Sequence, residues 1–225
     1  MDKLAERNQY YLALLGDIRR SRSRFPRIRE RAQSEFLDII EDVNARHRSK
    51  LAVPFSVSRG DEFQGLLSRP DSALEIIDAF DARTDLFSFR YGLGWGEVGT
   101  AFRPRTTEMD GSCFLNAYGA LERCKTENRW VAFEGAPVER EHVVNAGFRS
   151  IQVIRDGWTT KQKTAVNMRR GRDTMSATAV AMGIDKSTLS KMLKAAHYEQ
   201  LLEMEGAVRI LLREYLDPSI SDGRP

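Results

Sequence analysis

The 225-residue chain has little cysteine and little histidine, with two residues of the first and three of the second. Cys113 and Cys124 show no CxxC spacing and no nearby histidine cluster. This scarcity excludes the usual zinc-binding patterns and a disulfide framework. We expect both cysteines to be ordinary, partly buried thiols.

The chain also lacks a long apolar run, because no stretch approaches the roughly 20 residues that cross a bilayer. Its first residues, "MDKLAERNQ", show no signal-peptide pattern. Hydrophobic residues make up 41% and charged residues 30%, which is typical of a globular protein. We therefore expect a cytoplasmic protein with no membrane partner, and its length allows one large domain or two ordinary ones.

A strong net charge is missing as well, since the whole chain carries only +3. The distribution is more informative than the total. Residues 155–195 hold nine basic and three acidic side chains. A local excess of this kind is typical of a module that faces nucleic acid.

The pattern of apolar residues predicts a mixed α/β (α+β) fold for the first part of the chain. The predicted strands are residues 10–18, 51–58, 62–68, 87–100 and 129–135. The predicted helices are residues 34–47, 69–83, 111–125 and 137–148. The resulting order is the split βαβ, or ferredoxin-like, arrangement with additions. Glycines within 87–100 predict a strand whose backbone is closely approached by a neighbour.

From Trp158 onward the sequence contains no strand candidate and is predicted to be helical throughout. We therefore predict two domains: an α/β palm domain over 1–154 and a helical domain over 155–225. The apolar spacing in "EQLLEMEGAVRILLREYL" predicts a last helix that packs on a partner helix.

The segment "SATAVAMGIDKSTLSKML" predicts two helices joined by a tight turn at Gly183, which is a helix-turn-helix. The residues predicted to face inward are Ala177, Val180, Ala181, Ile184, Leu189, Met192 and Leu193. The residues predicted to contact double-stranded DNA are Lys186, Ser187, Thr188, Ser190 and Lys191. Short polar side chains early in such a helix reach base edges, while lysines contact phosphates. The alternative is a helical hairpin used for dimerisation.

Two predicted strands each deliver an aspartate after a glycine, in "YYLALLGDIRRS" and "SRGDEFQGLL". If these strands are neighbours, Asp17 and Asp61 can share one cation, with Glu62 adjacent and the Ile18 carbonyl as a further ligand. Oxygen ligands of this kind select Mg²⁺ or Mn²⁺, which usually bind jointly with phosphates. The basic segment that begins at Arg19 would then meet a polyphosphate. Alternatively, Asp17 caps the following segment and Glu62 pairs with Arg59 on the surface.

Four segments, "ALLGDIRRS", "SRGDEFQGLL", "RYGLGWGEVGT" and "MDGSCFLNAYGALER", occur in an order found in a known group of proteins. In order and context they resemble the SatD family, bacterial proteins that often carry a C-terminal helix-turn-helix. They are similar, more remotely, to the palm of class III nucleotidyl cyclases and GGDEF diguanylate cyclases. The resemblance covers about residues 10–135 and implies a palm that binds a divalent metal and a nucleotide.

The resemblance also has departures. In class III cyclases an asparagine is followed four residues later by an arginine, which stabilises charge on the transferring phosphoryl group. Asn116 matches the asparagine, but the fourth position on is Ala120, and Arg123 lies one turn further. We take Arg19, Arg59 and Asn116 as the candidate nucleotide-binding residues.

These observations favour a regulatory protein in which a metal- and nucleotide-binding palm is joined to a DNA-binding helix-turn-helix. A homodimer is expected, because two half-sites give useful affinity for DNA. The second hypothesis is an enzyme, a nucleotidyl cyclase or nucleotidyltransferase that uses two metal-binding aspartates. The third is an oligomerising adaptor without a ligand. Ala120 weighs against the second hypothesis, and the basic block 155–195 weighs against the third.

Overall fold

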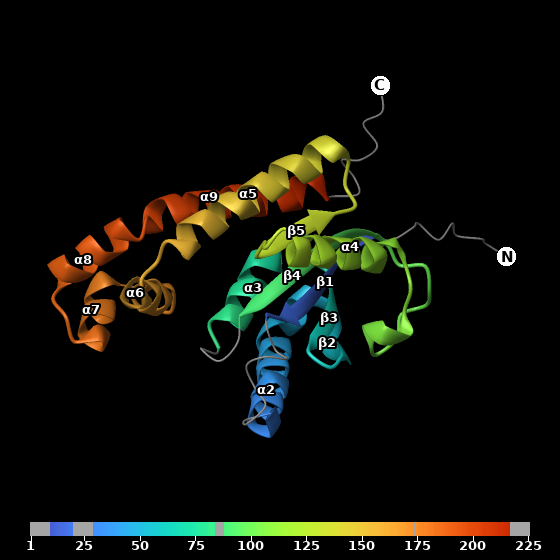
Figure 1. The fold of residues 1–225 in the computed structure, drawn as a ribbon, viewed down its shortest axis with the longest axis horizontal. Helices are drawn as coiled ribbons and strands as arrows, with labels where there is room; N and C mark the ends of the chain where they lie inside the picture. Colours follow the sequence, from blue (N-terminus) through green and yellow to red (C-terminus); the bar gives the residue numbers. More distant parts are fainter. Residues whose placement is uncertain (1–9, 20–28, 84–87, 173, 217–225) are drawn as a thin grey trace. The chain divides into compact units, whose positions relative to one another are not determined.

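The structure is a computed structural model that describes residues 10–19, 29–83, 88–172 and 174–216 (Figure 1). The chain forms two compact units, residues 1–145 with 209–225 and residues 146–208. Helices α5 (Val138–Asp156) and α9 (Tyr198–Tyr215) each contribute residues to both units. The predicted domain boundary near residue 155 falls within α5 and stays a prediction.

The first unit is built on a five-stranded sheet in which the strands lie in the order β2-β3-β1-β4-β5. The strands are β1 (Tyr10–Ile18), β2 (Leu51–Arg59), β3 (Glu62–Leu67), β4 (Phe89–Glu97) and β5 (Val131–Glu134). Neighbouring strands are antiparallel except for β4 and β5, which are parallel. This topology is the split βαβ arrangement with β5 added. The predicted ferredoxin-like α+β fold is therefore confirmed.

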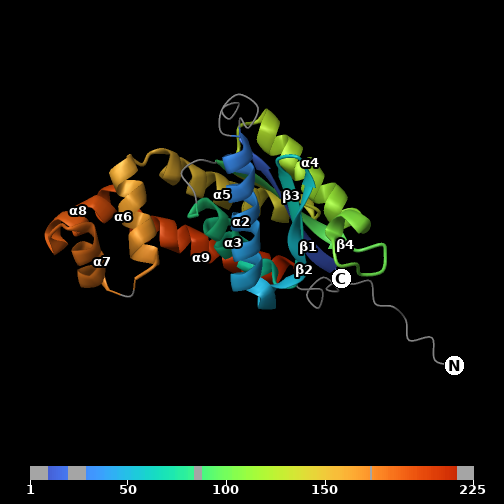
Figure 2. The ribbon, with the colours of Figure 1, turned by 90° about the horizontal axis from the view of Figure 1, so that it is seen from below.

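Helices cover both faces of this sheet (Figures 1 and 2). Helices α2 (Arg29–His47) and α3 (Ala73–Asp81) pack on one face, and α4 (Ser112–Thr126) packs on the other, against β1, β4 and β5. Short 3-10 helices lie at Arg48–Lys50, Pro70–Ser72 and Thr106–Glu108. Because β1 is covered on both sides, its residues from 12 to 18 are buried.

Aromatic rings fill the face of the sheet beneath α2 and α3. The rings of Phe63 and Phe80 have centroids 4.5 Å apart, and Phe55 meets Phe80 edge to face at 5.2 Å. A Cβ atom at Gly16 would lie 2.1 Å from the Phe63 ring. Gly16 is therefore needed where β1 crosses this aromatic core, immediately before Asp17.

On the opposite face of the sheet, α4 lies directly on the backbone of β4. Cβ atoms at Gly92 and Gly94 would each come within 2.1 Å of backbone atoms of Ala117, and one at Gly96 would come within 2.4 Å of the Ser112 hydroxyl. Such contacts exclude any side chain at these three positions. The close backbone approach predicted from the glycines is confirmed.

The two cysteines are buried and free, and both belong to α4. Burial raises the pKa of the Cys113 thiol and of the Cys124 thiol to about 12. Since the thiolate is the reactive form, both are chemically inert, packing residues.

The second unit contains α6 (Thr160–Arg170), α7 (Met175–Met182) and α8 (Lys186–Ala195), which pack against one another. Between Trp158 and the end of α9, the described residues include no strand, in agreement with the predicted helical texture. None of the described helices has the length and apolar content needed to cross a bilayer.

The turn between α7 and α8 forms as predicted. Gly183 ends α7 with a left-handed backbone (φ 65°), and the Ile184 amide donates to the Ala179 carbonyl, as in a helix C-cap. The carboxylate of Asp185 then caps α8 by accepting from the Thr188 amide at 2.7 Å. Leu189 and Leu193 of α8 are both buried, as predicted.

The predicted inner face of α7 is wrong. Ala177, Val180 and Ala181 are exposed, and the buried residues are Thr178 and Ala179. Six of the eight residues of α7 are apolar and they occur on all sides of the helix, so the sequence contains no pattern that could fix which side faces inward. The hydroxyl of Thr178 can be buried because it donates to the Thr174 carbonyl at 3.0 Å.

Candidate functional site

A row of charged side chains crosses three adjacent strands at one end of the sheet. Asp17 lies directly opposite Glu62 of β3 and Arg90 of β4 in the strand register. Directly opposite residues share a face of the sheet. Ala13 and Leu15 pack with residues of α4, so the alternation of β1 puts Asp17 on the α4 face as well. Asp17 is only 7% exposed.

Helix α4 adds a lysine to this row. Cys113, Ala117 and Leu121 face the sheet at four-residue intervals, and Lys125 continues the same stripe. The Lys125 ammonium donates to the Glu62 carboxylate at 3.0 Å and to Glu122 at 2.9 Å. The sequence prediction missed Lys125, although this four-residue spacing was a signal that could have identified it.

Asp61 lies in the turn between β2 and β3, after Gly60 with its left-handed backbone (φ 58°). The turn is tied to the end of β1, because the Ile18 amide donates to the Asp61 carbonyl at 3.3 Å. The structure therefore brings the predicted residues Asp17, Ile18, Asp61 and Glu62 to one end of the sheet. We call Asp17, Asp61, Glu62, Arg90 and Lys125 the Asp17 site.

Opposing electrostatic effects act on Asp17. Together they raise the pKa of its carboxyl group to about 6: burial and the negative charges of Asp61 and Glu62 raise it, and the positive charges of Lys125 and Arg90 lower it. Desolvation is the largest of these effects. The burial of Asp17 thus makes the charged form of its carboxyl group energetically unfavourable.

The Lys125 ammonium is held in its charged form. Burial on its own would lower the pKa of Lys125, but hydrogen bonds to Glu122 and Glu62 and the charge of Asp17 raise it above its usual range. The carboxylates of the Asp17 site are therefore faced by a permanent positive charge from α4.

Carboxylate oxygens fit the predicted Mg²⁺ or Mn²⁺, which takes one or two protein carboxylates and completes its shell with water and phosphate oxygens. In the part of the chain that the structure describes, no three His, Cys, Asp or Glu side chains are grouped closely enough to hold a metal by themselves. The donor types fit, and the cation stays a prediction. Glu62 forms its ion pair with Lys125 rather than the alternative pair with Arg59.

Two of the predicted nucleotide-binding residues lie at this end of the sheet. The Arg19 amide, directly after β1, donates to the Ser88 carbonyl at 2.7 Å, and its guanidinium donates to the Asn128 side chain. Arg59 is exposed at the end of β2, opposite Glu62 in the register. Nucleotide binding by either residue stays a prediction.

Asn116 is not brought to the Asp17 site. Its side-chain amide donates to the Trp95 carbonyl at 2.8 Å. Trp95 and Arg90 are five residues apart on β4, a separation of about 16 Å at roughly 3.3 Å per residue. Within one chain, Asp17 and Asn116 therefore do not contact the same part of a ligand.

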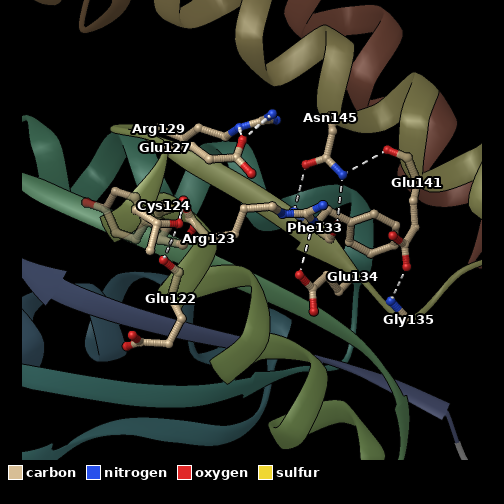
Figure 3. Close-up of polar contacts among 12 residues, drawn as sticks. Glu122, Arg123, Cys124, Glu127, Arg129, Phe133, Glu134, Gly135, Glu141 and Asn145 are labelled. Carbon is tan, nitrogen blue, oxygen red and sulfur yellow. Dashed lines mark hydrogen bonds and ion pairs between the residues drawn. The ribbon is translucent and has the colours of Figure 1, made fainter.

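Arg123 also points elsewhere. Figure 3 shows its side chain leaving α4 toward β5, where it donates to the Phe133 carbonyl at 2.8 Å and pairs with Glu134 at 3.2 Å. Asn145 of α5 binds the Phe133 backbone on the same side. Ala120, at the position where cyclases have arginine, is fully buried. Neither residue offers a positive charge to the Asp17 site.

Comparison with known protein families gives a match over most of the chain. The family model that matches is the SatD family, over residues 11–209. The chain belongs to the SatD family. No curated protein matches this SatD chain.

Among solved structures, the SatD chain is similar to one titled as a bacterial light-regulated adenylyl cyclase. The two share 14% sequence identity, and the TM-score is 0.39. The similarity covers 59% of the SatD chain and 45% of the other chain, so the SatD chain spans less than half the length of that protein.

The second candidate site of the SatD chain is the outer surface of α8. The residues predicted to contact DNA are all exposed on this helix: Lys186, Ser187, Thr188, Ser190 and Lys191. Lys194, which was not predicted, extends the same basic surface. The hydroxyls of Ser187 and Thr188 donate to the Asp185 carboxylate at 2.6 and 2.7 Å, while both side chains stay exposed.

Proposed function

We propose that this SatD family member is a bacterial regulatory protein with two binding activities. The α+β unit would bind a divalent cation together with a phosphate-bearing ligand such as a nucleotide. The helical unit would bind double-stranded DNA through α8. The observation that carries the DNA assignment is that a Gly183-turn helix-turn-helix presents all of its predicted contact residues to solvent.

The composition of α8 supports this choice over the dimerisation hairpin. Exposed lysines at 186, 191 and 194 match phosphates, and the short polar residues between them suit base edges. A dimerisation helix would expose apolar residues along this surface. In α8, by contrast, the leucines Leu189 and Leu193 are buried. We infer that the protein acts as a homodimer on two half-sites about 34–36 Å apart.

Fluorescence anisotropy with full-length protein and mixed-sequence duplexes tests the DNA assignment. The logarithm of the affinity should fall with the logarithm of the salt concentration, by about 0.9 per phosphate contacted. Lys186→Ala with Lys191→Ala should weaken binding on all sequences and flatten this slope by about 2 for each bound protomer, or about 3.6 for a dimer. Arg103→Ala with Arg105→Ala, two exposed residues of the first unit, is the charge-matched control. Equal slopes for both double variants would rule out the α8 assignment.

Cation binding is supported by the buried carboxylate of Asp17, which lies beside Glu62 and within the field of Asp61. Divalent metal should raise the melting temperature of the protein by mass action. Asp61→Asn should abolish that rise. If the variant responds to Mn²⁺ as strongly as the parent does, the cation binds elsewhere.

Our proposal does not include cyclase turnover. The position of the transition-state arginine is a buried alanine, Ala120, and Arg123 is engaged with β5. Loss of one such group commonly costs roughly 10²- to 10³-fold in rate. If the protein produces substantial cyclic nucleotide from ATP or GTP, and Asp17→Ala abolishes this activity, the protein is instead a nucleotidyl cyclase.

A further inference from the structure

Helix α9 has two apolar stripes, and one of them is exposed. The buried stripe contains Leu201, Val208 and Leu212. The exposed stripe contains Leu202 and Ile210, whose side chains are 43% and 47% exposed. Single exposed apolar residues are common on protein surfaces, so the charges around these two decide what the stripe can contact.

The charges beside the exposed stripe change sign at the middle of the helix. Glu199 and Glu203 lie in the first half of α9, whereas Arg209 and Arg213 lie in the second half. All four are exposed. Because α9 is one continuous helix, its 3.6 residues per turn put these four side chains on the same side as the exposed stripe. We call the whole set the α9 surface: Glu199, Leu202, Glu203, Arg209, Ile210 and Arg213.

The α9 surface is symmetrical about Gly206. Its two apolar residues lie four positions before and four positions after Gly206. One glutamate and one arginine lie three positions before and after, and the other glutamate and arginine lie seven positions before and after. The signs are opposite within each of these two pairs, so the surface is complementary to a copy of itself that runs in the reverse direction.

Pairing in the reverse direction gives each side chain a suitable neighbour. When two copies of α9 lie antiparallel about Gly206, each residue is level with the one equally far beyond Gly206 in the partner. Every glutamate of the α9 surface is then level with an arginine, and each leucine is level with an isoleucine. A parallel pair would instead put glutamate beside glutamate and arginine beside arginine, which repels.

The backbone at the centre of the α9 surface is open to a second helix. Outside α9 itself, no atom of the described residues lies within 4 Å of where a Cβ of Gly206 would be. Packed helices have axes about 8–10 Å apart, which leaves room for a methyl group at their crossing but not for a long side chain. Gly206→Ala is therefore compatible with a helix pair at this point.

We propose that two copies of this chain pair antiparallel through the α9 surface, about a two-fold axis at Gly206. Leu202 packs beside Ile210 of the partner subunit, and each glutamate forms an ion pair with an arginine across the axis. This inference rests on the homodimer of the proposed function and assigns its surface and its direction. Since α8 ends shortly before α9 begins, the two helix-turn-helices then attach at opposite ends of the helix pair, as two separate half-sites require.

Sedimentation equilibrium of the full-length protein measures the dissociation constant of the dimer. Leu202→Ser should raise this constant about a hundredfold, because two leucines per dimer lose an apolar contact. Leu115→Ser, at a leucine of α4 that is 69% exposed, is the matched control and should leave the constant unchanged. Leu202 is itself exposed in the single chain, so its replacement removes no core contact of the fold.

Charge reversal tests the direction of the pair. Glu203→Arg and Arg209→Glu should each raise the dissociation constant about tenfold, because each puts like charges level at two places in the dimer. The double variant exchanges the charges and should return to the value of the parent. Such recovery shows that the single variants are not misfolded. Arg103→Glu, at an exposed residue of the first unit, is the control for net charge.

Cross-linking tests the same direction without a change of charge. Both native cysteines are buried, so an oxidant should act on the thiols introduced by Leu202→Cys and Ile210→Cys. A mixture of the two variants should form cross-linked dimers. Each variant alone should form few, because identical residues of an antiparallel pair are about 12 Å apart along the helix axes. Efficient cross-linking of each variant alone would indicate a parallel pair and overturn the inference.

The outcomes separate this inference from the proposed function. If the parent forms dimers whose dissociation constant neither Leu202→Ser nor the charge reversals change, the inference is overturned and the homodimer forms through another surface. If Leu202→Ser weakens the dimer but the double charge variant does not recover, the antiparallel direction is wrong. If the parent stays monomeric at submillimolar concentration, the inference fails together with the homodimer of the proposed function, while the anisotropy assay still tests DNA binding by α8.

Discussion

The two units of this protein place their candidate functional charges in opposite environments. In the α+β unit, Asp17 and Arg90 are largely buried side by side on the sheet. In the helical unit, the lysines of α8 extend from a helix whose buried residues are leucines. A buried charge affects the free energy of folding, whereas an exposed one mainly affects what the surface attracts. Substitutions in the first unit should therefore change stability as well as binding, and those on α8 should change binding alone.

The largest expected loss of stability lies in the helical unit, which does not follow the contrast everywhere because it also contains a buried carboxylate. Glu205 of α9 is 1% exposed and pairs with Arg155 at 2.9 Å and with Arg170. Glu205→Ala leaves two arginines without this partner and should destabilise the protein by about 3–5 kcal/mol. Urea denaturation measures the change, with Glu203→Ala on the exposed side of α9 as the control. Equal stability of the two variants would mean that this cluster is solvated.

The next effect concerns the contact between α4 and β4. Gly94→Ala would put a methyl group 2.1 Å from the Ala117 amide nitrogen and the Cys113 carbonyl oxygen. Backbone atoms cannot move aside as side chains can, so we expect a loss of about 2–3 kcal/mol. A shift in the denaturation midpoint measures it. A midpoint equal to that of the parent would show that α4 can move away from the strand.

A smaller effect, of opposite sign, is expected at Asp17. Its pKa rises from 3.8 to about 6 on folding, so its ionisation opposes folding once the pH exceeds the unfolded value. Asp17→Asn should stabilise metal-free protein by up to about 3 kcal/mol above pH 6. The gain should shrink as the pH falls toward 4, where the parent carboxyl is protonated in the folded state. Denaturation in EDTA at pH 4.5 and 7.5 measures both values, and a gain that is larger at pH 4.5 would contradict the sign.

The smallest effect is a stabilising substitution in a helix with free space. Apart from the neighbouring backbone of α9 itself, no atom of the described residues lies within 4 Å of where a Cβ of Gly206 would be, and the Gly206 backbone is not left-handed. Gly206→Ala should add about 0.5–1 kcal/mol, because alanine has less conformational entropy to lose. It is also the control for Gly94→Ala, since the two changes are chemically identical. Destabilisation by Gly206→Ala would indicate a partner that packs on α9 too closely to admit a methyl group.

The elements of the fold were predictable where the sequence pattern has a single structural meaning. The apolar run that ends at Gly16 allows only a strand buried on both faces, and glycines at 92, 94 and 96 allow only a closely approached one. Helix α7 lacked such a pattern. Six of its eight residues are apolar, on all sides of the helix, so its orientation depends on packing against α6 and α8, and the sequence pattern does not reveal that packing.

The candidate site was predictable only in its local half. Asp17 and Asp61 stand out because an acidic residue follows a glycine at the end of an apolar strand. Lys125 comes from a helix more than sixty positions after Asp61, and its place depends on which side of α4 meets the sheet. The distance of Asn116 from the Asp17 site could not be predicted for the same reason, because it depends on where along β4 the Asn116 end of α4 packs.

The burial of both cysteines has a practical consequence for fluorescence work. With the Cys113 and Cys124 thiols inside α4 packing, maleimide reagents have no native target in the folded chain. Ser176→Cys, at an exposed position of α7, would then be the single labelling site without removal of any native residue. A dye attached there would report on the surroundings of the helix-turn-helix in an otherwise unmodified protein.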